Sequence, residues 1–275
     1  MTFTLSALAC VALAAAAAAA VPTVAGPHGA LRVDDGGSGG LPVVFVHGNG
    51  GNHTQWQAQL AHLRASRRAV AIDLHGMGGS APAADGDYSV QSFADDVQAV
   101  VGALGIKRFV LVGHSYGGYV VAAYAGRHPE RLAGLVFADC AGDLSKTPPA
   151  DLAGLRRGLE PDRYEEFTRR WFAGILAGGT DRTKVAVMQS LAATPRETFV
   201  GATLGLYAFP MSEALARYGG PRLSIASFLL ENPVAVHNTF LELPVEAIRA
   251  ASHWLMLDCP DDFNRILDSF LARIA

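Results

Sequence analysis

The chain contains the stretch Phe109-Val110-Leu111-Val112-Gly113-His114-Ser115-Tyr116-Gly117-Gly118, and a segment of helical character follows it from Tyr119 to Ala125. The apolar run before Gly113 predicts a buried strand, so Ser115 falls at a sharp turn from strand to helix. A serine at such a turn is held in a strained conformation that presents its hydroxyl group. Glycines on both sides leave room for the strand and the helix to pack closely. The stretch therefore predicts a nucleophilic serine, Ser115, within an α/β fold.

Apolar strands and amphipathic helices alternate on both sides of this stretch. We expect strands at 42–46, 68–72, 108–112 and 133–138, and helices near 55–64, 89–104 and 117–127. This alternation is typical of a mostly parallel central sheet with helices on both faces. After a long interruption, strands are expected again at 222–229 and 245–250, before a last helix at 261–273.

Four polar residues lie at the carboxyl ends of predicted strands: His47, Asp73, Ser115 and Asp139. Because the carboxyl ends of parallel strands meet at one edge of a sheet, where ligands bind, we expect these residues to lie at one site. The glycines after Asp73, in the pattern Asp-X-X-Gly-X-Gly-X-Ser, indicate that this carboxylate caps a turn.

The order of these blocks resembles the α/β-hydrolase superfamily. The resemblance rests on His47-Gly48-Asn49-Gly50-Gly51 after the first strand, on the Gly-X-Ser-X-Gly turn, and on the late block from Ala251 to Asp258. It extends from about Leu41 to Ala275 and implies the α/β-hydrolase fold, with a helical lid inserted into the core.

The resemblance also implies a catalytic arrangement. Ser115 is the expected nucleophile, and His253 is the expected base that takes its proton. The backbone N–H groups of Asn49 and Tyr116 are expected to form the oxyanion hole. The sequence has no metal, nucleotide or flavin motif, so we expect a site without a cofactor.

The carboxylate partner of His253 has two candidates. Most superfamily members place an aspartate after the penultimate strand, but Leu230-Glu231-Asn232-Pro233 offers only Glu231 there. Some branches take the acid from the strand after the nucleophile helix, where Asp139 follows Leu135-Val136-Phe137-Ala138. We favour Asp139, because the stretch from Glu231 to His253 is short for the usual intervening helix. The alternative for Asp139 is that it caps a loop.

These features divide the chain into four parts. Residues 1–25 are expected to be a signal peptide or a disordered extension, 26–142 and 221–275 the two parts of the core, and 143–220 the lid. The bulky residues of the lid are expected either to line an apolar substrate cavity or to pack in the lid's own core. They are Tyr164, Phe167, Trp171, Phe172, Met188, Phe199, Tyr207, Phe209 and Met211.

Residues Leu5 to Ala20 form an alanine-rich apolar run, followed by small-X-small patterns that end at Ala20 and Ala25. This run resembles a secretory signal peptide and predicts a periplasmic or secreted protein with no stable membrane insertion after processing. The first residues carry no Lys or Arg, so the alternative is a cytoplasmic protein with a low-complexity extension. Outside this segment, Cys140 and Cys259 are expected to form either a disulfide or two buried free thiols.

The composition indicates a compact enzyme rather than a disordered protein. The chain has 275 residues, of which 50% are hydrophobic and 17% charged, and its formal net charge is −3. The absence of a Lys/Arg cluster argues against a nucleic-acid partner, because phosphates require a basic face. We therefore expect a small-molecule partner, and the sequence carries no signal for an oligomeric state.

The resemblance implies a serine hydrolase that cleaves carboxylic esters, or related acyl or carbon–carbon bonds, of a small and fairly apolar substrate. Branches that attack epoxides or carbon–halogen bonds use an aspartate nucleophile, so Ser115 disfavours them. Cofactor-free haloperoxidase or perhydrolase activity and hydroxynitrile-lyase chemistry fit the same residues. Non-catalytic ligand binding is a further alternative, because fold alone does not determine function.

Overall fold

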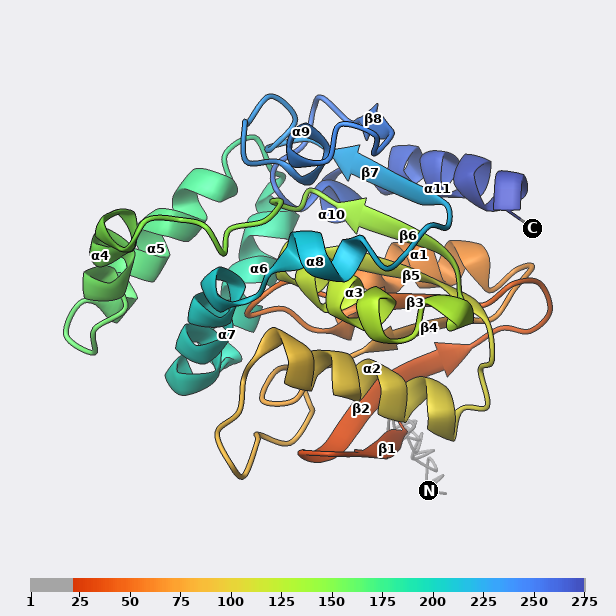
Figure 1. The fold of residues 1–275 in the computed structure, drawn as a ribbon, viewed down its shortest axis with the longest axis horizontal. Coiled ribbons are helices and arrows are strands. Elements are labelled where there is room, and N and C mark those ends of the chain that lie inside the picture. Colours follow the sequence, from red (N-terminus) through yellow and green to blue (C-terminus); the bar gives the residue numbers. More distant parts are fainter. Residues whose placement is uncertain (1–21, 275) are drawn as a thin grey trace, which may run out of the picture.

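The computed structural model describes residues 22–274, which form a central sheet flanked by helices (Figure 1). The sheet has eight strands in the order β1-β2-β4-β3-β5-β6-β7-β8. The strands from β4 to β8 pair in parallel, as the alternating pattern predicts, whereas β1 and β2 pair antiparallel. Their bounds are β1 Thr23–Gly26, β2 Gly29–Gly36, β3 Val43–Val46, β4 Ala69–Ile72, β5 Phe109–His114, β6 Leu132–Ala138, β7 Arg222–Ala226 and β8 Val245–Ala247.

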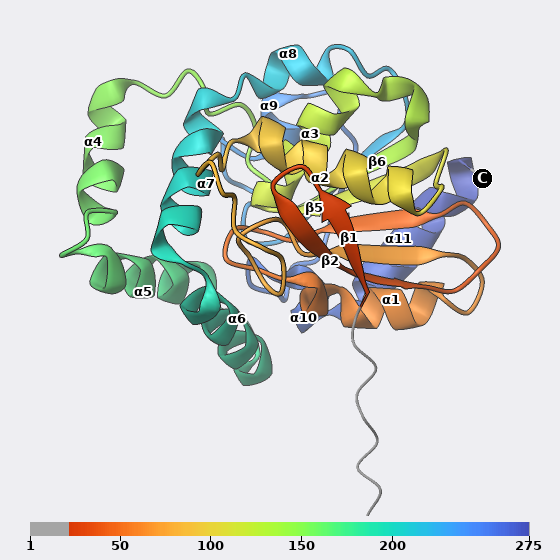
Figure 2. The same cartoon turned by 90° about the horizontal axis from the view of Figure 1, so that it is seen from below.

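Two layers of helices cover the sheet (Figure 2). One layer contains α2 (Val90–Ala103) and α3 (Tyr116–Arg127), and the other contains α1 (Gln57–Leu63), α10 (Leu255–Asp258) and α11 (Pro260–Ile274). The central strands are buried on both faces, which explains their continuous apolar sequences. In β3, Val44 and Val46 pack in the first layer, while Val43 and Phe45 pack in the second.

Five helices lie between β6 and β7, and we call them the helical insert. They are α4 (Pro149–Gly158), α5 (Tyr164–Ile175), α6 (Asp181–Ala193), α7 (Arg196–Ala208) and α8 (Met211–Leu215). Figure 1 shows α4 and α5 farthest from the sheet, whereas α8 packs against α3. The insert lies in the segment for which the sequence predicts a lid. No helix within residues 22–274 is long and apolar enough to cross a membrane.

The sequence pattern does not predict the hairpin of β1 and β2. Only Leu31 and Val33 of β2 are buried, so the strand is polar and shows little apolar periodicity. Strand β1 begins at Thr23, inside the extension expected over 1–25. Residues 1–21, with the apolar run interpreted as a signal peptide, lie outside the described part of the chain.

Two strands are shorter than predicted. Strand β7 is expected to reach residue 229, but it ends at Ala226. Beyond it, the N–H groups of Ser227 and Leu229 do not pair with a strand, because they donate to Asp139 Oδ1 at 2.8 and 3.1 Å. Strand β8, expected over 245–250, ends at Ala247 on the exposed edge of the sheet.

Asp143 joins the two ends of the helical insert. Its Oδ1 accepts hydrogen bonds from the N–H and the hydroxyl of Ser145 at 3.0 and 2.6 Å. Its Oδ2 accepts one at 2.9 Å from the N–H of Ser212, in the first turn of α8. Partial burial acts to raise the pKa of Asp143, but these hydrogen bonds outweigh it and lower the pKa to about 2. The ionised carboxylate is therefore the form that holds these segments together.

We expect Asp143→Asn to lower the free energy of unfolding at neutral pH by about 1 kcal/mol, a modest loss because water screens this partly exposed group. The folded-state pKa is depressed, so the stabilisation is complete above the unfolded value near 3.8 and is lost as the pH falls toward about 2. Urea denaturation at pH 7 and pH 3 tests this, with exposed Glu246→Gln as the control. If wild type and Asp143→Asn differed in the free energy of unfolding by the same amount at pH 7 and pH 3, this prediction would be wrong.

Candidate active site

Ser115 lies on the turn between β5 and α3 and has a strained backbone. Its φ of 52° and ψ of −117° lie outside the regions that residues with a side chain favour. The neighbouring glycines make this turn possible. A Cβ on Gly113 would overlap the carbonyl oxygen of Gly117, and one on Gly117 would lie 2.6 Å from the carbonyl oxygen of Val46. The predicted strand–turn–helix around Ser115 is thus present in the structure.

His253 is paired with Asp139. The Nδ1 of His253 donates to Oδ2 of Asp139 at 2.7 Å, and both side chains are buried. Because Nδ1 carries the shared proton, Nε2 is the nitrogen that is left to accept a proton. His253 and Ser115 line the same cavity. This arrangement fixes the tautomer of His253 in a cavity that Ser115 also lines.

Asp139 is fully buried, and its carboxylate has hydrogen-bond donors on both oxygens. Besides the His253 ring on Oδ2, the N–H groups of Ser227 and Leu229 donate to Oδ1. Its backbone has a φ of 49°, a left-handed conformation that aspartate tolerates better than most residues. Such partners offset the cost of burying a carboxylate.

Glu231, the other candidate acid, lies at the protein surface. Its side chain is 84% exposed, and its Oε1 lies 3.6 Å from Nη1 of Arg249. The structure therefore brings Asp139, but not Glu231, together with His253.

Two hydrogen bonds hold the backbone of His253. The Nε2–H of His114 donates to its carbonyl at 2.8 Å, and its own N–H donates at 3.1 Å to the carbonyl of Ile175, at the end of α5. Burial, together with the nearby His253 ring, holds the pKa of His114 well below its usual value, so His114 is neutral. The sequence gives no indication of this contact, because the two residues are 139 positions apart.

The two predicted oxyanion-hole donors flank Ser115. Asn49, in the loop after β3, and Tyr116, the first residue of α3, line the same cavity as the serine. Within residues 22–274, the backbone N–H groups of Asn49 and Tyr116 have no hydrogen-bond acceptor. Both groups are therefore available to bind a ligand oxygen.

His47 fixes the loop that carries Asn49. Its Nδ1–H donates to the carbonyl of Gly48 at 2.8 Å, and its Nε2 accepts from the N–H of Leu74 at 3.1 Å. This pattern requires a neutral ring, and burial lowers the pKa of His47, which keeps it neutral.

The same loop is hydrogen-bonded to the helical insert. The side-chain amide of Asn49 donates to the carbonyl of Phe199 and to the hydroxyl of Thr203, both on α7, at 2.9 Å each. On α6, the hydroxyl of Ser190 donates to the carbonyl of Gly50 at 2.7 Å and accepts from the amide of Asn52 at 2.9 Å. The position of the Asn49 N–H thus depends on the insert.

A mostly apolar cavity of about 210 Å³ contains Ser115, His253, Asn49 and Tyr116 in its lining. Of the nine bulky insert residues considered from the sequence, Trp171, Phe172, Phe199 and Tyr207 line this cavity, and the other five do not. The cavity also contains core and loop residues that the sequence did not predict as lining. They include Tyr119, Phe228, Leu229 and Trp254. Of these, only Trp254 could have been found from the sequence, because it is next to His253.

Cys140, Cys259 and Asp73, which the sequence also singled out, lie outside the lining of this cavity. Cys140 and Cys259 are free thiols, the first buried and the second partly exposed. Burial raises the pKa of Cys140 well above its usual value, which makes this thiol unreactive. Asp73 accepts from the N–H of Gly79 at 2.8 Å, in agreement with the predicted turn cap. Within residues 22–274, no cluster of His, Cys, Asp and Glu could hold a metal ion.

Comparison with known sequences identifies the family. Residues 42–175 match the family model described as alpha/beta hydrolase fold. A 2-hydroxymuconate semialdehyde hydrolase of Pseudomonas putida is 37% identical over 251 residues, which cover 85% of this chain and 88% of that protein. A protein of the same name from Pseudomonas sp. (strain CF600) is 39% identical over 114 residues, only 40% of each chain.

Solved structures show the same fold. Est816, an N-acyl homoserine lactone degrading enzyme, superimposes with a TM-score of 0.75 at 27% identity, over 90% of this chain and 100% of that one. A thermophilic esterase from Thermogutta terrifontis superimposes with a TM-score of 0.78 at 24% identity, over 92% and 98% of the two chains. The mostly parallel sheet, the strained turn at Ser115 and these relatives together show that the chain belongs to the α/β-hydrolase superfamily of enzymes.

Proposed function

We propose that this protein is a serine hydrolase that cleaves carboxylic esters, or related acyl or carbon–carbon bonds, of a small and fairly apolar substrate. The observation that carries the proposal is the buried hydrogen bond of 2.7 Å between His253 and Asp139, because His253 lines the same cavity as the strained Ser115. A hydroxyl becomes a strong nucleophile only beside such a base.

The reaction of an ester proceeds in two steps in this proposal. Nε2 of His253 takes the Ser115 proton while Oγ attacks the substrate carbonyl carbon, and Asp139 stabilises the imidazolium. The proton then passes to the leaving alkoxide, and an acyl group remains on Ser115. Water, deprotonated by His253, attacks this acyl-enzyme, and the proton returns to Ser115 as the acid leaves.

The negative charge of each tetrahedral intermediate falls on the former carbonyl oxygen. The backbone N–H groups of Asn49 and Tyr116, which have no acceptor within residues 22–274, would donate to it. The N–H of Tyr116 also lies at the N-terminus of α3, where the helix dipole favours negative charge. Each such donor lowers the barrier by about 3 kcal/mol.

The cavity supports a small substrate with an apolar part. Its volume of about 210 Å³ suits a small molecule, and its mostly apolar, aromatic lining leaves few polar groups to recognise a hydrophilic one. The comparisons support a small-molecule substrate, because they include a hydrolase named for 2-hydroxymuconate semialdehyde and an enzyme that degrades N-acyl homoserine lactones.

Labelling with a fluorophosphonate, combined with hydrolysis of short-chain p-nitrophenyl esters, tests the proposal. We expect one adduct, on the peptide that contains Ser115, and ester turnover that the reagent abolishes. His253→Ala should remove both labelling and turnover, because the hydroxyl then has no base. A folded protein that is neither labelled nor active would support non-catalytic ligand binding instead.

A second prediction concerns the hydrogen bonds between the insert and the loop of Asn49. Ser190→Ala leaves the carbonyl of Gly50 and the amide of Asn52 unpaired, so the loop should shift and the Asn49 N–H should lose its alignment. We expect kcat to fall about tenfold with little change in KM, because the donor acts on the transition state. Ser269→Ala, an exposed serine of α11, is the control. A change in KM alone would contradict this prediction.

A further inference from the structure

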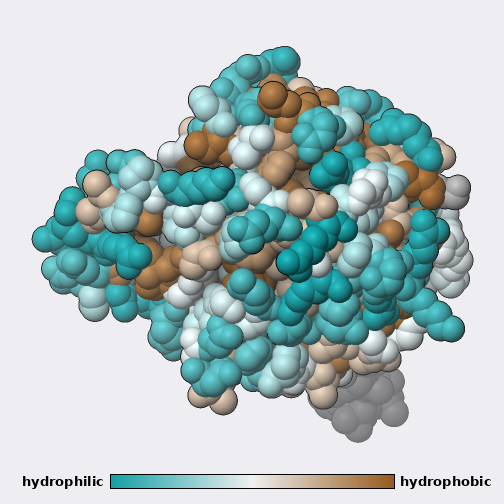
Figure 3. Space-filling view, in the orientation of Figure 1, coloured by the Kyte–Doolittle hydropathy of each residue, from teal (hydrophilic) through white to brown (hydrophobic). Residues whose placement is uncertain are grey.

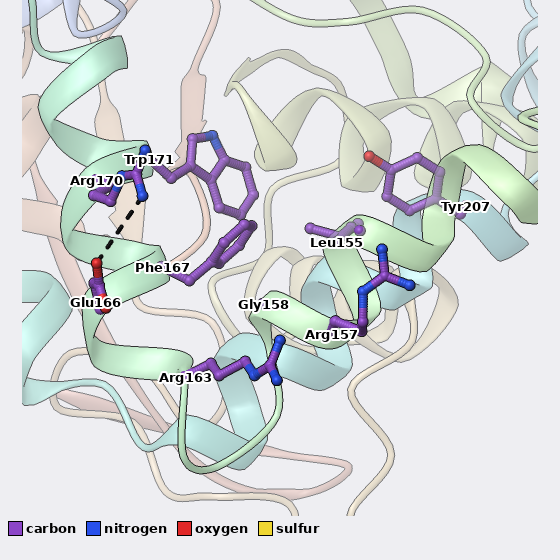
Figure 4. A pocket seen from close by; sticks show the side chains of 10 residues that line it. Leu155, Arg157, Gly158, Arg163, Glu166, Phe167, Arg170, Trp171 and Tyr207 are labelled. Carbon is purple, nitrogen blue, oxygen red and sulfur yellow. Dashed lines mark ion pairs between the residues drawn. The ribbon is translucent and has the colours of Figure 1, made fainter.

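A second cavity, of about 860 Å³, opens between α4 and α5 on the insert. Figure 4 shows it from close by, with Phe167 and Trp171 on one side and Leu155 and Arg157 on the other. We call it the arginine groove, because Arg157, Arg163 and Arg170 line it. The proposed mechanism uses none of these residues.

The groove is positively charged, although the chain as a whole has a net charge of −3. Its lining contains three arginines and a single acid, Glu166, which lies 4.0 Å from Arg170. Arg163 has only distant partners, Asp162 at 3.8 Å and Glu160 at 3.9 Å, and Arg157 has no ion pair within residues 22–274. The guanidinium group of Arg157 is therefore available to bind an anion, and the long, exposed ion pairs of Arg163 leave its guanidinium group only weakly held.

The wall beneath these charges is aromatic. The rings of Phe167 and Trp171 lie 5.8 Å apart along α5. Phe167 packs closely on α4 because residue 158 is a glycine: a Cβ on Gly158 would overlap the Phe167 ring. In Figure 3 the lobe formed by α4 and α5 is hydrophilic on its outer side and hydrophobic toward the core. A matching ligand combines an apolar segment with an anionic end.

The groove adjoins the catalytic cavity. Trp171 and Tyr207 belong to the lining of both. These two side chains therefore separate the arginines from the space that contains Ser115. A molecule that contacts both linings would have one end near Ser115 and the other among the arginines.

We propose that the arginine groove binds the carboxylate end of the substrate. The preferred substrate is then an ester whose acyl chain ends in a carboxylate, with an apolar segment that spans Trp171 and Tyr207. Guanidinium groups bind carboxylates through two parallel hydrogen bonds, and the aromatic wall buries the segment between the two ends. This inference rests on the proposed hydrolase function and adds the substrate class.

The test uses p-nitrophenyl monoesters of α,ω-dicarboxylic acids of increasing chain length, each compared with its neutral ω-methyl ester. For chains long enough to reach the groove, we expect the carboxylate to raise kcat/KM about tenfold at low ionic strength, and added salt to reduce this preference. Arg157→Gln and Arg163→Gln should each lower kcat/KM for the carboxylate ester about three- to tenfold. Both variants should leave the neutral ester unchanged.

The chain supplies matched controls for these variants. Arg156 on α4 and Arg169 on α5 are exposed and do not line the groove. Arg156→Gln and Arg169→Gln therefore change the net charge by the same amount as the test variants but leave the groove lining intact. An equal loss in the controls would overturn the proposal, because the effect would then come from overall charge. Turnover of the neutral esters without a preference for the carboxylate at any length would also overturn it, yet leave the hydrolase function intact. Hydrolysis of neither ester would overturn both.

Discussion

Replacing Ser115 with alanine is expected to lower kcat for a short-chain p-nitrophenyl ester by about 10⁵- to 10⁶-fold. The reason is chemical: alanine has no hydroxyl group, so neither the acyl-enzyme nor the proton transfer to His253 can occur. The oxyanion-hole N–H groups and the cavity remain, so a small residual rate should persist. Steady-state kinetics and the loss of fluorophosphonate labelling measure the effect.

Ser115→Gly provides the control for folding. The φ of 52° at this position strains any residue with a Cβ, and glycine is free of that strain. We expect this variant to be as inactive as Ser115→Ala. Its free energy of unfolding should exceed that of the wild type by about 1 kcal/mol, because the relief of backbone strain outweighs the greater entropy of glycine in the unfolded chain. Thermal unfolding measures this difference. Retention of more than a few per cent of wild-type kcat by either variant would exclude Ser115 as the nucleophile.

Replacing Asp139 with asparagine is expected to lower kcat by about 10³- to 10⁴-fold. The hydrogen bond of 2.7 Å between His253 Nδ1 and Asp139 Oδ2 requires an acceptor on residue 139. In the variant, the amide oxygen would stay with the N–H groups of Ser227 and Leu229, and the amide NH₂ group would take the place of Oδ2. The Nδ1 of His253 would then accept a hydrogen bond, and the ring proton would move to Nε2, which could no longer act as a base. The loss should appear in kcat, and substrate binding should change little.

Glu231→Gln is the matched comparison, because Glu231 was the alternative acid. Its side chain is 84% exposed and lies near Arg249, so we expect activity within twofold of the wild type. The circular dichroism and melting temperature of both variants should be recorded, since Asp139 also accepts the N–H groups of Ser227 and Leu229. A folded Asp139→Asn variant with normal turnover, or a collapse of activity in Glu231→Gln, would refute the assignment.

The features that the sequence predicts best are those encoded by neighbouring residues. The turn at Ser115 follows from a strand, a helix and three glycines within ten positions, so its chemistry is visible in one short stretch. The buried strands β3 to β6 are equally evident, since both of their faces are apolar. The polar hairpin of β1 and β2 gave no such signal, and its strands exist because β2 pairs with the edge of β4.

By itself, then, the sequence determined the α/β pattern, the nucleophile turn and the position of His253 in its flanking block. Only the tertiary structure shows that Asp139, and not Glu231, lies against His253. Asp139 and His253 are 114 residues apart in the sequence. The parallel pairing of β6 with β7 and of β7 with β8 brings the segments after these strands to one edge of the sheet, with Ala138 opposite Ile225. That pairing brings the loop after β7 onto the carboxylate, while Glu231 continues past it to the surface. A contact of this kind depends on which strands pair across the sheet, and the residues around Asp139, Glu231 or His253 do not by themselves encode that pairing.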